Sequence, residues 1–261
     1  MQRYFVSPAQ FNGQSITITD DDAHHIIRVM RMKEDDQVIV SDNAKRTVIA
    51  KIVEFGSHEV KLEVVDEHVQ TTEPQWQVSI AQALPKGDKM ELIVQKCTEI
   101  GAVQFVPFES QRVIVQYDHK KEAKRIERWQ KIVKEAAEQS HRNKIANVET
   151  TKTFKQLLEM FSSYNLVLFC YEETGKGKEG QAIKDVLQTF KAEIEEQEQS
   201  SPIRILVVAG SEGGFTEQEA QLAKDAGAKL VGLGKRILRA ETAGIVALTC
   251  IMYESGEMGG V

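Results

Sequence analysis

The sequence lacks a long apolar run. No stretch of about 18 apolar residues, the length needed to cross a bilayer, occurs among its 261 residues. Its first residues, MQRYFVSPAQFNGQ, also lack the basic start and apolar core of a secretory signal peptide. These absences argue against a membrane or secreted protein, and we expect a cytoplasmic one with no membrane partner.

Cysteine is scarce and widely spaced. Cys97, Cys170 and Cys250 lie in apolar surroundings, and no C-x-x-C pair occurs. This spacing speaks against a disulfide framework or a zinc site and favours reduced thiols packed in the core. The aspartates at 20–22 and 35–36 are typical of helix starts and turns, so we expect no metal site.

The first 72 residues contain short segments in which polar and apolar residues alternate. These segments are 15–19, 37–41, 47–53 and 59–65. Alternation of this kind indicates strands with one buried face, and only one helix-like segment separates them. The sequence therefore predicts a small β-barrel over residues 1–72, with a linker at 70–75.

After residue 72 strands alternate with helices. The near-continuous apolar segments are 78–84, 103–108, 165–170, 204–209 and 228–233. Helix-like segments separate them, and Asp88 and Thr216 are expected to cap two of these helices. Apolar strands spaced by helices indicate a parallel sheet covered on both faces. Residues 73–261 are thus expected to form an α/β domain that binds its ligand at the carboxyl ends of the strands.

A glycine-rich turn, GSEGG at 210–214, follows one of these strands. The turn matches neither the dinucleotide pattern G-x-G-x-x-G nor the P-loop. The carboxylate of Glu212 would also repel a pyrophosphate, whereas a cationic or polar ligand could accept it. A purely structural turn, with Glu212 paired to a nearby arginine, is the alternative.

A second turn follows the last strand. Its sequence, LGKRILRAETA, leads into the apolar helix expected at 243–252. A glycine turn followed by a helix start leaves backbone N–H and C=O groups free, and these suit the edges of an adenine ring. The two turns together favour a binding site over a structural one.

Charge is distributed unevenly. The chain carries a net charge of −6 at pH 7, which argues weakly against a general polyanion binder. Between Arg112 and Lys144, however, ten Lys and Arg stand against five Asp and Glu. Such a segment could attract phosphates. A solvated helix face with i,i+4 ion pairs is an equally good interpretation.

The blocks GSEGGFTEQE and LGKRILRAETA, preceded by ALPKGDKMELIVQKCTEIGA and EAAEQSHR, closely resemble the bacterial ribosomal RNA small subunit methyltransferase E family of the SPOUT superfamily. The segments RYFV and HHIIRVMRM extend the resemblance over essentially the whole chain. The resemblance implies a PUA-like β-barrel at 1–72 that helps to hold RNA. It also implies a SPOUT-type α/β methyltransferase domain at 73–261 with a deep C-terminal trefoil knot, a rare feature that periodicity does not reveal.

The activity implied by the resemblance is S-adenosylmethionine-dependent methylation of N3 of uridine 1498 in 16S rRNA, within the assembled small ribosomal subunit. S-adenosylmethionine carries a sulfonium and no phosphate, so Glu212 is acceptable beside it. The resemblance further implies a homodimer formed partly by the last helix, and no role for DNA.

Other classes stay open. A ribose 2′-O-methyltransferase of the same superfamily is the nearest alternative. A non-catalytic RNA-binding or ribosome-assembly protein would explain the barrel and the basic segment but not the paired turns. A nucleotide-dependent oxidoreductase is suggested by strand and helix alternation alone, and the glycine turn disfavours it.

The resemblance also assigns site residues. One departure from the family pattern is Ser211, where proline is usual, which leaves the turn less restricted. Positions matching the family place eight residues in or beside the cofactor pocket: Gly210, Glu212, Gly213, Leu233, Gly234, Leu238, Arg239 and Thr242.

Two of these residues are candidates for catalysis. Uridine N3 must lose a proton before it can accept a methyl group. Arg239 cannot take that proton because its guanidinium stays protonated, but it can stabilise negative charge on the uracil carbonyls. Glu212 either accepts the proton or orients an arginine.

Arginine suits phosphate contacts and stacking on unpaired bases. His24 and His25 could contribute as well, although a histidine pair at a helix start more often caps or packs. The expected RNA contacts are Arg3, Arg28, Arg31, Arg112 and Arg142.

Overall fold

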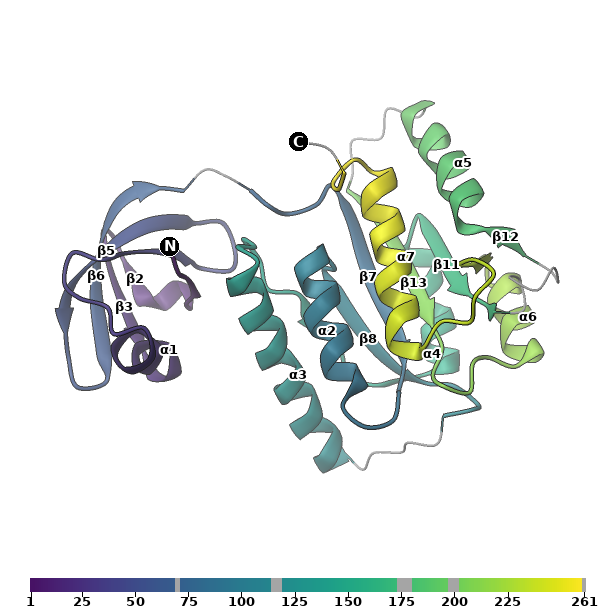
Figure 1. Ribbon diagram of the computed structural model, residues 1–261, viewed down its shortest axis with the longest axis horizontal. Coiled ribbons are helices and arrows are strands. Elements are labelled where there is room, and N and C mark those ends of the chain that lie inside the picture. Colours follow the sequence, from purple (N-terminus) through teal and green to yellow (C-terminus); the bar gives the residue numbers. More distant parts are fainter. Residues whose placement is uncertain (69–70, 114–118, 173–179, 197–201, 260–261) are drawn as a thin grey trace. The chain divides into compact units, whose positions relative to one another are not determined.

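The computed structural model describes residues 1–68, 71–113, 119–172, 180–196 and 202–259. These residues form two compact units, Met1–Glu73 with Lys134–Ile145 and Pro74–Val133 with Ala146–Val261. Figure 1 labels the helices and strands of each unit. The segment Lys134–Ile145 joins the first unit, although its position in the sequence falls within the second predicted domain. As functional domains, the ranges 1–72 and 73–261 stay a prediction.

The first unit contains a curled six-stranded sheet of order β1-β4-β5-β6-β3-β2. All neighbours are antiparallel except β1 and β4. Register shifts between β5 and β6 mark bulges, which bend the sheet. The strands are β1 (Arg3–Phe5), β2 (Phe11–Asn12), β3 (Ser15–Thr19), β4 (Gln37–Ser41), β5 (Thr47–Phe55) and β6 (Glu59–Glu67).

The alternating pattern explains the core of this unit. Ile16 and Ile18 of β3 are fully buried, whereas the residues between and beside them are more exposed. They pack with Val38 of β4, Ile52 of β5 and Leu62 of β6. Three short helices also belong to the unit, η1 (Pro8–Gln10), α1 (Asp20–His24) and the π-helix η2 (His25–Val29), as does the end of α3 (His119–Gln139) from Lys134 onward.

The second unit contains a sheet in which every described pair is parallel, with order β10-β8-β7-β13-β11-β14-β12 and β9 beside β8. The five predicted strands are confirmed, with ends shifted by no more than two residues. The strands are β7 (Trp76–Ala83), β8 (Gln104–Glu109), β9 (Asn147–Val148), β10 (Lys152–Thr153), β11 (Leu166–Cys170), β12 (Gln181–Ala182), β13 (Ile203–Ala209) and β14 (Lys229–Gly232).

Helices cover both faces of this sheet, as its apolar strands require. Leu206 and Val208 of β13 pack on one face with residues of α4 and α6. On the other face, α7 lies against β7 and β13 and packs beside α2 (Figure 1). The helices are α2 (Lys89–Ile100), α3 (His119–Gln139), α4 (Phe154–Met160), η3 (Phe161–Ser163), α5 (Ile183–Glu196), α6 (Glu217–Asp225) and α7 (Ala240–Glu254).

The capping signals are partly confirmed. At the start of α6, Glu219 N donates to Thr216 Oγ1 at 3.1 Å, and Thr216 N donates to Glu219 Oε2 at 2.9 Å. Asp88 occupies the N-cap position of α2, but its side chain makes no capping hydrogen bond. The trefoil knot implied by the resemblance stays a prediction.

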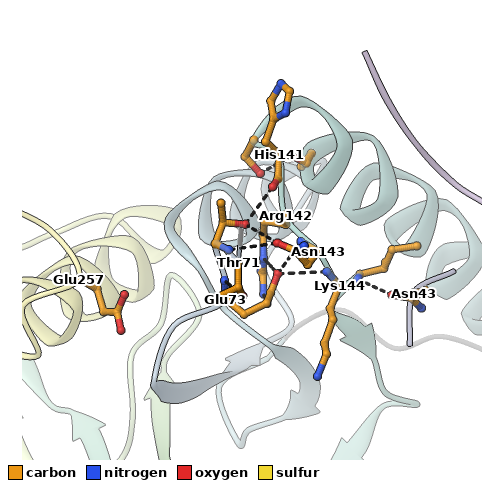
Figure 2. Close-up of polar contacts among 12 residues, drawn as sticks. Asn43, Thr71, Glu73, His141, Arg142, Asn143, Lys144 and Glu257 are labelled. Atoms are coloured by element: carbon orange, nitrogen blue, oxygen red, sulfur yellow. Dashed lines mark hydrogen bonds and ion pairs between the residues drawn. The ribbon is translucent and has the colours of Figure 1, made fainter. Parts of the chain in front are cut away.

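A buried ion pair clamps residues 141–144 within the first unit (Figure 2). Arg142 Nη2 donates to Glu73 Oε2 at 2.6 Å, and the N–H groups of Asn143 and Lys144 donate to Glu73 Oε1. The carbonyl of Arg142 accepts from Arg3 Nη1 at 2.7 Å. Because the Arg142 side chain is only 4% exposed, an unpaired Glu73 would leave a charge in a poorly hydrated place.

Replacing Arg142 with Met should destabilise the first unit. The Arg142→Met variant keeps most of the buried volume but leaves the Glu73 carboxylate without its cation. We expect the free energy of unfolding to fall by about 3 kcal/mol, the low end for breaking a buried pair, because two backbone donors remain. Urea titration followed by circular dichroism measures this change.

The matched control is Lys61→Met, which breaks the pair between Lys61 and Glu54 at 3.0 Å. Both of its side chains are exposed, so the urea midpoint should stay unchanged. Equal midpoints for the two variants would show that the clamp has no structural role.

Candidate active site

β13 and β14 lie on either side of β11, and all three run in parallel. Their carboxyl ends therefore meet at one edge of the sheet, the edge at which such sheets bind ligands. The turn at 210–214 follows β13, and the turn at 233–239 follows β14. Gly214 (φ +61°) and Gly234 (φ +118°) adopt the left-handed backbone that favours glycine.

Two cavities open at this edge. The first, of about 240 Å³, is lined by the first turn with Lys89, Arg239 and Ala240. The second, of about 190 Å³, is lined by the second turn with Val231. The residues that line both are Cys170, Glu172, Ile237, Leu238 and Ala243. This shared wall joins the two cavities into one site.

Six of the eight predicted cofactor residues line these cavities. The first cavity contains Gly210, Glu212 and Arg239, the second contains Leu233 and Gly234, and Leu238 borders both. Gly213 and Thr242 lie elsewhere, and their cofactor contacts stay a prediction.

Gly213 lies against Arg112 and not in the wall of either cavity. Its carbonyl accepts from Arg112 Nη1 at 2.9 Å, and a Cβ on Gly213 would come within 2.9 Å of the Arg112 Cβ. Gly214 occupies the cavity wall in its place. Thr242 is in the first turn of α7, where its N–H donates to the carbonyl of Arg239.

Gly210 is held in place by its neighbours. Its carbonyl accepts from Gln82 Nε2 at 3.0 Å. A Cβ at this position would lie 3.2 Å from the Phe215 ring and 3.3 Å from the Cα of Gly214. The Phe215 ring itself packs on Phe169, with ring centroids 4.1 Å apart, so it has little room to move. Glycine is therefore the residue that fits this turn.

Lys89, at the start of α2, is a site residue that sequence reasoning did not single out. Its Nζ lies 2.6 Å from Glu212 Oε1 and 3.6 Å from Glu241 Oε2. The expectation that Glu212 pairs with an arginine is wrong, because its partner is this lysine. The block ALPKGDKME contains Lys89, but nothing in its pattern identifies which of its charged residues reaches the site.

The pair shifts the pKa of both groups, and each shift favours the charged form. Burial would raise the pKa of the Glu212 carboxyl, but hydrogen bonds from Lys89 and from the N–H of Lys86 hold that pKa below its ordinary value. The hydrogen bond to Glu212 in turn raises the pKa of Lys89. At neutral pH both groups are charged, and Glu212 is a weak base.

The wall offers groups that a polar ligand can satisfy. Ser211 Oγ is buried and has no hydrogen-bond partner among the described residues. The site therefore fits a ligand with polar groups at this turn. Burial raises the pKa of Cys170 to about 12, so this thiol is neutral.

The predicted RNA contacts fall into two groups. Arg28, Arg31 and Arg112 are exposed. Arg3 and Arg142 are 2% and 3% exposed, and both take part in the clamp around Glu73. Their burial argues against direct contact with RNA, and we leave them out of the proposed contacts.

The basic segment between Arg112 and Lys144 has both ion pairs and lysines open to solvent. Arg128 Nη2 lies 2.7 Å from Glu91 Oε2, and Lys134 Nζ lies 2.6 Å from Asp22 Oδ1. Lys120 and Lys124, which lie on α3 together with Arg128 and Lys134, are exposed. Ion pairs thus neutralise part of the segment and leave part of it open to solvent.

Three further observations bear on the class of protein. In the described part of the chain, no helix has both the length and the apolar character to span a membrane. The same residues contain no group of three His, Cys, Asp or Glu side chains able to hold a metal. The dinucleotide pattern G-x-G-x-x-G, which the turn at 210–214 lacks, occurs at residues 175–180, but 175–179 lie outside the described residues.

Two family models match the chain. The model for an RNA methyltransferase domain matches residues 71–252, and the model for an RNA methyltransferase PUA domain matches residues 18–65. Ribosomal RNA small subunit methyltransferase E of Bacillus subtilis is 37% identical, over all of this chain and 99% of the relative. The protein of that name from Synechocystis is 34% identical, over 95% of this chain and 76% of its own length.

Solved structures of methyltransferases are also similar to this chain. Ribosomal RNA small subunit methyltransferase E from Neisseria gonorrhoeae, bound to S-adenosyl methionine, matches with a TM-score of 0.81 at 28% identity and covers 97% of each chain. A structure from Legionella pneumophila, in complex with bound SAM, matches with a TM-score of 0.82 at 25% identity and covers 96% of each chain. The similarity spans both units.

Adding one methyl group at Gly210 should weaken cofactor binding. In the Gly210→Ala variant the turn or the Phe215 ring must shift by a few tenths of an ångström, and the ring has little room because it packs on Phe169. We expect the Kd for S-adenosylmethionine to rise about tenfold, equivalent to about 1.4 kcal/mol. Isothermal titration calorimetry of the full chain measures this change.

Gly244→Ala is the control. Its Cβ would meet ordinary contacts, the nearest at 3.6 Å from Ile80 Cγ2, and alanine suits the interior of α7. The Kd of this variant should match that of the unmodified chain. Equal losses in the two variants would mean that Gly210 has no special place in the turn.

Proposed function

The chain belongs to the ribosomal RNA small subunit methyltransferase E family, and we propose that it methylates N3 of uridine 1498 of 16S rRNA within the assembled small ribosomal subunit. S-adenosylmethionine-dependent methylation of ribosomal RNA, and the SPOUT-type α/β fold preceded by a PUA domain, follow from membership. One observation carries the proposal. The two turns that resemble the family's motifs border one site at the edge of the parallel sheet.

The site suits the cofactor. S-adenosylmethionine supplies a methyl group activated by a sulfonium. The turn with Leu233 and Gly234 would hold its adenine ring, and Ser211 Oγ would gain a polar partner. The Glu212 carboxylate is compatible with a sulfonium and would have repelled the phosphates of a dinucleotide.

We place the reacting uracil beside the first cavity, which Lys89 and Arg239 both line. Nearby positive charge favours the deprotonated form of N3 and stabilises the charge that spreads onto the uracil carbonyls. Arg239 would act through its guanidinium donors. Because Glu212 is a weak base held by Lys89, we assign it the orientation of Lys89, and the N3 proton passes to solvent water.

Binding of the large substrate needs surfaces beyond this site. Arg28, Arg31 and Arg112 are the exposed arginines that we assign to RNA contacts. Helix α7 is apolar on most of its surface, and its Tyr253 is 68% exposed, which supports a homodimer formed partly by this helix. A ribosomal substrate also places the protein in the cytoplasm.

Product mapping tests the proposed acceptor. Small subunits from cells that lack this protein are incubated with the full chain and labelled S-adenosylmethionine, and the modified nucleotide is isolated. We expect label at N3 of uridine 1498. Label on a ribose 2′ oxygen, or on a different nucleotide, would refute the acceptor while leaving the methyltransferase assignment intact.

The Arg239→Ala variant tests the electrostatic role. Loss of a charge that acts mainly on the transition state should lower kcat by about 10²- to 10³-fold and change the Kd for S-adenosylmethionine little. Single-turnover methyl transfer and calorimetry measure the two quantities. Equal losses in both would mean that Arg239 only binds the cofactor.

Two other variants complete this test. Arg204 is exposed at the opposite end of β13, over the Tyr164 ring, and Arg204→Ala should leave kcat unchanged. Glu212→Gln should lower kcat less than Arg239→Ala does. A loss in Glu212→Gln as large as that in Arg239→Ala, with a changed acid limb of the pH profile, would instead make Glu212 the proton acceptor.

A further inference from the structure

The first unit contains a cavity of its own, of about 460 Å³, which the proposed reaction does not use. Its wall combines the loop between β4 and β5, the end of β6 and the clamped segment around Asn143. Figure 2 shows part of this wall, with Thr71, Glu73 and Lys144 near Asn143.

Polar residues make up almost all of the wall, with their aliphatic stems exposed as well as their polar groups. Ser41 and Thr47 are buried hydroxyl residues in it, and Asn143 connects them: Ser41 Oγ donates to the Asn143 carbonyl, and Asn143 Nδ2 donates to Thr47 Oγ1. Among the described residues of the wall, His68 is the one aromatic side chain and Ala44 the one aliphatic side chain. A base that binds by stacking would find little support here, whereas a ligand rich in oxygen would.

The carboxylates in the wall already have cations. Arg46 Nη2 lies 2.9 Å from Glu67 Oε1, and Glu73 is held by Arg142 at 2.6 Å. Lys45 and Lys144 line the same cavity, and neither ammonium group is paired with a carboxylate among the described residues. The cavity therefore has two uncompensated positive charges.

The backbone that carries these lysines is fixed. Asp42 Oδ1 accepts from the N–H groups of Ala44, Lys45 and Arg46 at 2.8 to 2.9 Å. Lys144 N donates to Glu73 Oε1 at 3.0 Å. Between them, Ile145 N donates to Asn43 Oδ1 at 2.7 Å, which ties the two loops together. A site whose backbone is already ordered loses less entropy when it binds a charged ligand.

We propose that this cavity binds the ribose-phosphate backbone of the RNA substrate, with Lys45 and Lys144 each contacting a phosphate and the Ser41, Thr47 and Asn143 side chains facing the sugar. This assignment rests on the proposed function only in taking ribosomal RNA as the ligand. It does not depend on which nucleotide is methylated. Contacts of this kind position a substrate and carry no sequence information.

The test is the salt dependence of binding to small ribosomal subunits. The full-length double variant Lys45→Gln/Lys144→Gln keeps the length of both side chains and removes two charges. Each lost phosphate contact with unpaired RNA should reduce the slope of log K against log salt by about 0.7, so the double variant should lose about 1.4. At 0.1 M salt this equals about a 25-fold loss of affinity. In methyl transfer, KM for subunits should rise by a larger factor than kcat falls.

The matched control is Lys51→Gln/Lys61→Gln, which removes the same charge from the same unit. These two lysines lie outside the cavity and are paired with Asp35 and Glu54. The slope for this variant should stay at the value of the unmodified chain. Thermal unfolding followed by circular dichroism confirms that both double variants fold.

The outcomes separate the two proposals. Equal slopes for the two double variants would overturn the cavity assignment, whatever the activity. A reduced slope for Lys45→Gln/Lys144→Gln alone would support the assignment. That result would stand even if the label mapped to a nucleotide other than uridine 1498, which would refute only the proposed acceptor.

Discussion

The parallel pairing of β13, β11 and β14 is the constraint on which the active site depends. Parallel strands end at one edge, so residues that follow Ala209 and Gly232 meet although about twenty positions separate them. Glycine at 214 and 234 then lets the chain turn sharply enough to leave backbone groups open to a ligand. The helices on the two faces bury the apolar strands and keep this edge rigid.

The charges at this edge are arranged to favour an anion beside a cation-bearing cofactor. Glu212 alone would make the first cavity acidic, but Lys89 lies 2.6 Å away and neutralises it. Glu172 and Arg239 line the same cavity with opposite charges, and Arg239 has no carboxylate partner among the described residues, so its guanidinium is the cation left to meet negative charge. This balance suits a uracil that must carry negative charge during the reaction, and it accepts a sulfonium that already carries positive charge.

Sequence reasoning predicted the features that depend on local pattern. The apolar strands and the glycine turns were identified because burial and left-handed backbone select particular residue types at neighbouring positions. It did not identify Lys89, because Glu212 is 123 positions away. It also misjudged Arg142, since an arginine 69 positions from its carboxylate partner has no local sign that it is buried. Long-range ion pairs are thus the features of the site that the local sequence pattern could not predict.

The state of Cys170 has a practical consequence for inhibitor design. This thiol lines both halves of the active site, where it would attract attention as a target for electrophilic compounds. Burial raises the pKa of this thiol, which disfavours the thiolate at neutral pH, and the thiolate is the species that reacts. Covalent warheads aimed at this position would label it slowly, so reversible analogues of the cofactor are the better starting point.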